Sequence, residues 1–102
     1  MTVDDLLDQC IGFDWDAANL EKNWERHHVA FWEAEEAFFN KPLLVGPDPD
    51  HSERERRFFA LGQTDAGRPL FLAFTIRRHL VRVISARDMT RKETRTYAHT
   101  KA

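Results

Sequence analysis

Residues 56–87 read RRFFALGQTDAGRPLFLAFTIRRHLVRVISAR, and this stretch decides the fold. It contains three runs rich in β-branched and aromatic residues, which are typical of strands. The runs cover 56–64, 69–76 and 80–87, and the breaks between them cover 65–67 and 77–79. Breaks this short join antiparallel neighbours, so the sequence predicts a meander of three strands.

Upstream of the meander the pattern predicts a short strand at 11–15 and two helices at 17–27 and 31–40. Asp16 is a suitable N-cap for the first helix, and Pro42 ends the second. The other segments are a short helix or frayed lead-in at 1–10, a strand-compatible segment at 43–45 and a loop at 46–55.

The last strand is followed by TRKE, in which Thr90 and Glu93 have the spacing of a capping box. A final helix is therefore expected to begin at Arg91. The order of elements predicts an α+β fold, a small antiparallel sheet with the two N-terminal helices packed on one face and a C-terminal helix. The other face of the sheet would carry the polar and basic strand residues.

The bulk composition is that of a single folded domain spanning residues 1–102. Hydrophobic residues make up 42% of the chain, yet no apolar run reaches the roughly 20 residues that a membrane helix requires. The N-terminus does not resemble a secretory signal, and Cys10 is the single cysteine. We therefore expect a cytoplasmic protein without a disulfide and without a membrane partner.

The charge is distributed unevenly along the chain. Residues 1–50 hold three basic and twelve acidic side chains, a net charge of −9, whereas residues 51–102 hold twelve basic and five acidic ones, a net charge of +7. The segment 81–97 alone has four arginines and a lysine. This asymmetry favours an anionic partner for the second half, although ordinary solvation of a polar surface is the alternative.

The residue types exclude several kinds of chemistry. The histidines do not have metal-ligand spacing, so no metal or other cofactor is expected. Cys10 is next to acidic residues, which disfavour a nucleophilic thiolate, and the glycines are too isolated for a phosphate loop. The residue types still allow metal-free cleavage of RNA, in which arginines neutralise the phosphorane and His or Tyr side chains carry protons.

Strand geometry limits which arginines can act together. Arg82 and Arg87 are five positions apart, so a regular strand points them to opposite faces. Both reach one site only if Arg87 lies beyond the strand end or a bulge intervenes. His27 has the alternative role of closing a helix end, and Tyr97 that of packing the last helix onto the sheet.

Several motifs together resemble the BrnT toxin family. They are FDWD (13–16), Asn23 with Arg26 and His27, the phrase RVISAR (82–87), and the tail Thr90, Glu93 and Tyr97. The resemblance covers about residues 12–98. It implies a RelE-like fold and a ribonuclease that blocks translation as the toxin of a type II toxin-antitoxin pair. It also implies neutralisation by BrnA, a ribbon-helix-helix antitoxin through which the complex would reach operator DNA.

By position, the resemblance places Arg57, Arg82, Arg87 and Tyr97 on the active surface, with His27 nearby. The other basic residues of the second hairpin and the last helix are expected to bind RNA. These are Arg77, Arg78, Arg91, Lys92 and Arg95.

The chain departs from the family pattern at Asn19 and Asp88, where basic residues are usual. The carboxylate of Asp88 would lie beside the expected site and oppose RNA binding. The departures favour an alternative, a non-catalytic module whose basic face docks the antitoxin. A sequence-specific DNA binder that acts alone is disfavoured by the lack of a helix-turn-helix signature.

Overall fold

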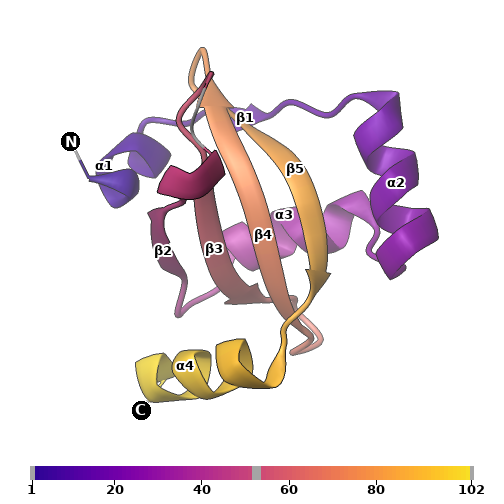
Figure 1. Ribbon diagram of the computed structural model, residues 1–102, viewed down its shortest axis with the longest axis vertical. Coiled ribbons are helices and arrows are strands. Elements are labelled where there is room, and N and C mark those ends of the chain that lie inside the picture. The colour runs from indigo at the N-terminus through magenta and orange to yellow at the C-terminus, as the bar shows by residue number, and fades with distance from the viewer. Residues whose placement is uncertain (1, 52–53, 102) are drawn as a thin grey trace.

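The three expected strands form the centre of a five-stranded sheet in the computed structural model (Figure 1). The structure describes residues 2–51 and 54–101. The strands are β1 (Gly12–Phe13), β2 (Leu44–Pro47), β3 (Phe58–Gln63), β4 (Pro69–Arg77) and β5 (Leu80–Asp88). The helices are α1 (Val3–Asp8), α2 (Ala17–His27), α3 (Phe31–Phe39), the short 3₁₀ helix η1 (Pro49–His51) and α4 (Arg91–Lys101). Across the sheet the order is β1-β5-β4-β3-β2.

The expected α+β class is confirmed, and the arrangement is compatible with the RelE-like fold that the resemblance implies. Both N-terminal helices and the helix from Arg91 lie where the sequence predicts them. The N-terminal extension contains α1, whose first turn is closed by a capping box between Thr2 and Asp5. Residues 1, 52, 53 and 102 of the expected segments lie outside the described residues.

The expectation of a purely antiparallel sheet is wrong, because β1 runs parallel to β5. Gly12 pairs with Leu80 and Phe13 with Val81, and the Ile11 amide donates to the His79 carbonyl over 2.8 Å. Parallel neighbours need a long crossover connection. The two helices and three strands between β1 and β5 provide it, and the resulting sheet is mixed.

The segment expected to be a loop from residue 46 is partly regular. Gly46 and Pro47 belong to β2, and η1 follows. A Cβ atom on Gly46 would lie 2.7 Å from Cε1 of Phe59, closer than real side chains approach. The missing side chain of Gly46 leaves room for the Phe59 ring on β3, and this glycine does not break the strand as the sequence suggested.

The core lies between the sheet and α3, which covers the back of the sheet in Figure 1. Its largest fully buried side chains are Phe74, Leu70, Leu72, Val29 and Val83. The two N-terminal helices do not share one face as expected, because α3 covers the back of the sheet while α2 runs beside β5. No helix within the described residues has the length and apolarity needed to cross a bilayer.

Helix α2 completes the edge of β5 where β1 ends. Ile84 is an extra residue in β5, since Ala73 pairs with Ser85 but Phe74 pairs with Val83. Such a β-bulge leaves ladder groups unpaired. Lys22 Nζ donates to the Ile84 carbonyl over 2.9 Å. Nearby, the buried Oδ1 of Asn23 accepts a hydrogen bond from the Ala86 amide over 3.2 Å.

We expect Asn23→Ala to lower the free energy of unfolding by about 1–3 kcal/mol, because it leaves the buried Ala86 amide without its acceptor. Urea denaturation followed by circular dichroism measures the change. Glu25→Ala, at an exposed position of the same helix, is the control and should alter stability by less than about 0.5 kcal/mol. Equal stabilities of the two variants would contradict the assigned role of Asn23.

Candidate nucleic-acid interface

The sheet face turned away from α3, called the open face below, carries four arginines. They are Arg57 directly before β3, Arg77 at the end of β4, and Arg82 and Arg87 on β5. Because side chains alternate along a strand, these residues point away from the core positions Phe58, Phe74 and Val83. The open face is therefore basic, as the sequence predicts.

The bulge at Ile84 explains why Arg82 and Arg87 share this face. Arg82 is directly opposite Thr75, and Arg87 is directly opposite Phe71. Without the extra residue the five-position separation would turn Arg87 toward the core. Of the two solutions that the sequence left open, the structure uses the bulge.

A groove of about 430 Å³ lies on the open face beside the segment that follows β2. Its floor comes from the sheet and its rim from residues around η1. It is lined by Asp50, His51, Arg54, Glu55, Arg57, Thr75, Arg77 and Ile84. The groove thus brings cationic, carboxylate and imidazole groups together over the centre of the sheet.

Glu55 is a groove residue that was not among the expected site residues. Arg77 donates to both of its carboxylate oxygens over 2.5 and 3.0 Å. The hydrogen bond from Arg77 is the main cause of a lowered pKa of Glu55, and Thr75 and Arg82 add to it. The carboxylate is therefore ionised at neutral pH. In the sequence, Glu55 and Arg57 are two positions apart directly before a strand, a spacing that could have indicated that both lie on the same face.

Arg82 is held by the two aspartates of the FDWD motif. Its Nη1 lies 3.2 Å from Asp14 Oδ2, and its Nη2 donates to Asp16. Asp16 also caps α2 by accepting from the Asn19 amide over 2.7 Å. Trp15, between them, donates from Nε1 to Glu35 on α3 over 2.9 Å. The motif therefore joins the start of α2 to β5 and fixes the Arg82 guanidinium.

Arg87 lies at the other end of the open face and connects β5 to α4. Its two terminal nitrogens donate to both Glu93 oxygens over 2.8 and 3.0 Å, and its Cζ lies 4.1 Å from the centroid of the Phe71 ring. Glu93 also forms the expected capping box with Thr90. Burial by itself would raise the pKa of Glu93, but the bonds from Arg87 and Thr90 outweigh it, so this pKa is lowered.

The two predicted proton carriers are not part of the groove lining. Tyr97 is buried, and its hydroxyl donates to the Pro42 carbonyl over 2.6 Å, which attaches α4 to the chain before β2. Burial raises the pKa of Tyr97. His27 ends α2, and its carbonyl accepts from Arg68 over 3.2 Å.

The predicted RNA-binding residues outside the groove are exposed. Arg78 is in the two-residue turn between β4 and β5, where it and His79 have positive φ angles of 52° and 62°. The exposed basic residues of α4 are Arg91, Lys92 and Arg95. The described basic surface therefore extends from the β4–β5 turn to α4, at opposite ends of β5 (Figure 1).

Asp88 is paired with Arg68, a residue that the sequence interpretation missed. Arg68 Nε donates to Asp88 Oδ1 over 2.8 Å, and Arg68 Nη1 lies 3.2 Å from Glu33 Oε2. Arg68 also donates to the carbonyls of His27 and His28 at the end of α2. Asp88, where the family usually has a basic residue, therefore belongs to a cluster of contacts that attaches the β3–β4 turn to α2.

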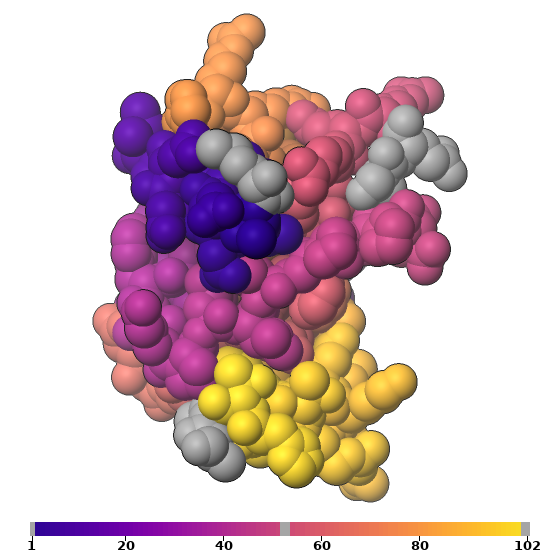
Figure 2. Space-filling model, turned by 90° about the vertical axis from the view of Figure 1, so that its left-hand side faces the viewer, coloured from indigo at the N-terminus to yellow at the C-terminus, as the bar shows by residue number. Residues whose placement is uncertain are grey.

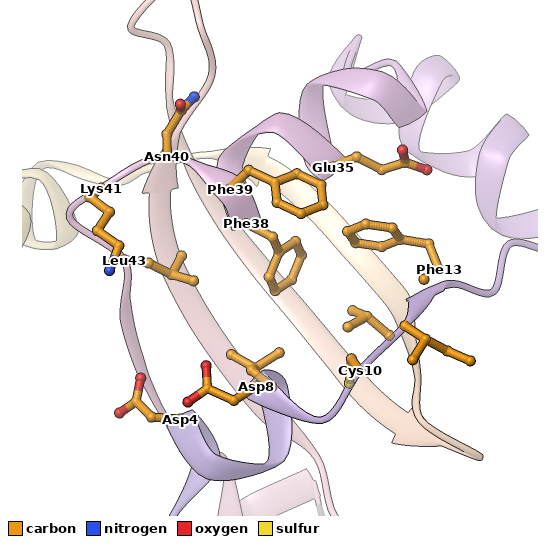
Figure 3. Close-up of a pocket in the computed structure, with 14 residues that line it drawn as sticks. Asp4, Asp8, Cys10, Phe13, Glu35, Phe38, Phe39, Asn40, Lys41 and Leu43 are labelled. Carbon is orange, nitrogen blue, oxygen red and sulfur yellow. The ribbon is translucent and has the colours of Figure 1, made fainter.

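A second hollow, of about 620 Å³, lies between α1 and the end of α3 (Figure 3). Phe13, Phe38 and Phe39 line one side, whereas Asp4 and Asp8 from α1 lie on the opposite rim. Figure 2 shows the N-terminal segment lying over this side of the molecule. An apolar hollow with an acidic rim does not suit a phosphate backbone, so the groove on the open face is the better candidate for a nucleic-acid site.

One comparison identifies the family. Residues 15–93, more than half of the chain, match the family model described as the ribonuclease toxin BrnT of type II toxin-antitoxin systems. The chain belongs to the BrnT family. The match begins inside the FDWD motif and ends at Glu93, so it includes the groove and all four arginines of the open face. A search of curated proteins found no match.

Membership of the BrnT family makes the chain a ribonuclease toxin by class and implies an antitoxin partner and an RNA substrate. Helix α1, strand β1 and Tyr97 lie outside the matched residues. Among residues 2–51 and 54–101, no group of three or more His, Cys, Asp or Glu side chains is placed to hold a metal ion.

The lowered pKa of Glu93 predicts a pH-dependent contribution to stability. A carboxyl group whose pKa is lower in the folded protein stabilises the fold at pH values above its ordinary pKa of 4.5. This stabilisation is lost as the pH falls through the pKa of the folded state. Glu93→Gln should cost about 1–2 kcal/mol at pH 7, and the difference from the parent should shrink below pH 4.5. Urea unfolding at a series of pH values tests this. A difference that is independent of pH would contradict it.

Tyr97→Phe separates packing from proton transfer. We expect a loss of about 1 kcal/mol in stability, because the Pro42 carbonyl loses its donor, with RNA cleavage unchanged. Thermal unfolding and cleavage of a labelled RNA are measured on the same preparation. If the folded variant fails to cleave, Tyr97 has the proton-transfer role that the resemblance implies.

Proposed function

We propose that this BrnT-family chain is a metal-independent endoribonuclease toxin that arrests growth by cutting RNA and so blocking translation. RNA would lie along the open face, with one phosphate in the groove. The observation that carries the proposal is the placement of Arg57, Arg77, Arg82 and Arg87 on one face of the sheet, with Arg57 and Arg77 lining that groove. Arginine forks suit phosphate oxygens and remain charged at any cellular pH.

The proposed roles follow from position. Arg57 and Arg82 are on either side of Thr75, so they would neutralise charge that develops on the attacked phosphate. Arg87 would hold the RNA farther along the face. The surrounding cations would contact the backbone and draw RNA to the surface; these are Arg77, Arg78, Arg91, Lys92 and Arg95. His27 and Tyr97 are the further catalytic candidates that the resemblance offers, but neither lines the groove, and Tyr97→Phe tests the second of them; no cofactor is needed.

The proposed partner is a BrnA-like ribbon-helix-helix antitoxin, through which the complex would contact operator DNA. The basic open face supports this pairing, because an acidic antitoxin segment could neutralise it. The hollow under α1 supports a separate contact on the opposite side of the molecule. The setting of such a pair is the cytoplasm.

A second candidate function is a non-catalytic, antitoxin-binding module. One observation favours it, since Arg77, Arg82 and Arg87 are each already paired with carboxylates of the same chain. Expression of the chain alone separates the two functions. Growth arrest with loss of RNA supports the ribonuclease, whereas normal growth with folded protein supports the docking module.

We expect Arg57→Ala to reduce cleavage by about 100-fold or more, the usual effect of removing one donor to a developing oxyanion. Growth after tight induction and cleavage of a labelled RNA by the purified chain are the two measurements. Arg26→Ala, at an exposed position on α2, removes a charge without touching the open face and is the control. Equal activities of the two variants would place the reaction away from the groove.

Arg87→Ala needs a matched comparison, because Arg87 also holds Glu93. Glu93→Gln weakens the same contact but keeps the arginine. If the loss of cleavage in Arg87→Ala greatly exceeds that in Glu93→Gln, Arg87 acts on RNA. Equal losses would indicate that Arg87 acts only by positioning α4.

A further inference from the structure

The rim of the groove contains a histidine that is oriented by a carboxylate. His51 Nδ1 lies 3.1 Å from both oxygens of Asp48. An imidazole that donates from Nδ1 to a carboxylate is fixed in one tautomer and leaves Nε2 to exchange a proton with a ligand. His51 is 63% exposed and lines the groove, so its ring is accessible to a bound RNA.

A second proton-transfer group lines the same groove. The Glu55 carboxylate is held by the two nitrogens of Arg77, and the guanidinium keeps it ionised. An ionised carboxylate accepts hydrogen bonds only, which suits a general base. The groove floor below adds the Thr75 hydroxyl and Arg57. A single hollow of about 430 Å³ is therefore lined by a carboxylate, an imidazole and an arginine, which are Glu55, His51 and Arg57.

We propose that Glu55 and His51 are the general base and the general acid of RNA cleavage in this groove. The inference rests on the proposed function and adds the residues that move protons. Neither has been assigned by the family resemblance, which pointed to Tyr97 and His27. Tyr97 is buried against Pro42, and the groove lining includes neither of those two side chains.

The reaction is a transesterification. The Glu55 carboxylate takes the proton of a ribose 2′-hydroxyl, and the 2′-oxygen forms a bond to the adjacent phosphorus. The bond from phosphorus to the 5′-oxygen breaks, and protonated His51 gives its proton to that oxygen. The products are a 2′,3′-cyclic phosphate and a 5′-hydroxyl, without a metal or a water molecule in this step. Arg57 and Arg82 balance the charge of the phosphorane.

The charged neighbours determine which group is acid and which is base. Asp48 and Asp50 belong to the segment around η1 and lie on the same rim as the imidazole. Across the groove are the carboxylate of Glu55 and the guanidinium groups of Arg54, Arg57 and Arg77. The carboxylate paired with Arg77 remains deprotonated, so it is the base, and the imidazole is left as the acid.

The test uses the purified chain and a 5′-labelled RNA of mixed sequence, in the presence of EDTA. We expect Glu55→Gln and His51→Gln each to lower the single-turnover cleavage rate by about 10²–10⁴-fold, the usual contribution of general acid–base catalysis. Matched controls are Glu25→Gln on α2 and His99→Gln on α4, both at exposed positions outside the groove. The controls should cleave at the parent rate.

Binding is measured separately with the same oligonucleotide carrying 2′-deoxyriboses, which lacks the nucleophile. Glu55→Gln should bind it at least as tightly as the parent, because it removes a negative charge, and His51→Gln should retain binding, because the floor arginines are unchanged. This readout also shows that each variant is folded. The products should carry 2′,3′-cyclic phosphate ends and 5′-hydroxyl ends.

The pH profile assigns the roles. Glu55→Gln should lose the rise in rate on the acidic side of the parent profile, because the base is gone. If the parent cleaves RNA and both variants cleave within about threefold of it, the proton carriers lie elsewhere and the proposed function still holds. Products with 3′-hydroxyl and 5′-phosphate ends would overturn the mechanism. A folded parent that cleaves no RNA would overturn the proposed function, and the assignment of the pair with it.

Discussion

The edge of β5 is the constraint on which the open face depends. The bulge at Ile84 reverses the alternation of β5, so that Arg82 and Arg87 share a face while Val83 and Ala86 stay in the core. A bulge would leave polar groups unpaired at an edge that β1 covers only in part. Lys22 and Asn23 of α2 form hydrogen bonds with these groups, so the helix and the bulge stabilise each other.

Carboxylates from other elements then fix three of the four arginines of this face. Asp14 and Asp16 hold Arg82, Glu55 holds Arg77, and Glu93 holds Arg87. The charge asymmetry between the two halves is therefore partly cancelled by folding. An exposed pair such as Arg77 with Glu55 adds little stability, but all of these pairs orient guanidinium groups before a ligand arrives. A phosphate would then meet donors that are already in position.

The two hollows of the molecule differ in chemistry. The groove on the open face holds arginines, a carboxylate and an imidazole, and it lies within the residues that match the BrnT family. The hollow under α1 is apolar with an acidic rim, and α1 lies outside the matched residues. Burial raises the pKa of the Cys10 thiol, which lines that hollow, and so disfavours the reactive thiolate there. The open face is therefore the better candidate for chemistry on nucleic acid.

The sequence by itself determined the elements: helices at 17–27 and 31–40, the three-strand meander, the Thr90 cap and the family motifs. These follow from local periodicity and capping, which involve residues close together along the chain. Only the tertiary structure decided the parallel pairing of β1, the bulge that turns Arg87 to the open face, and the carboxylate partner of each arginine. These depend on contacts between residues up to 68 positions apart, such as Arg82 and Asp14, and no local pattern encodes such contacts. For the same reason the groove, with Glu55 and His51 on its rim, becomes visible only when the segment after β2 lies on the sheet.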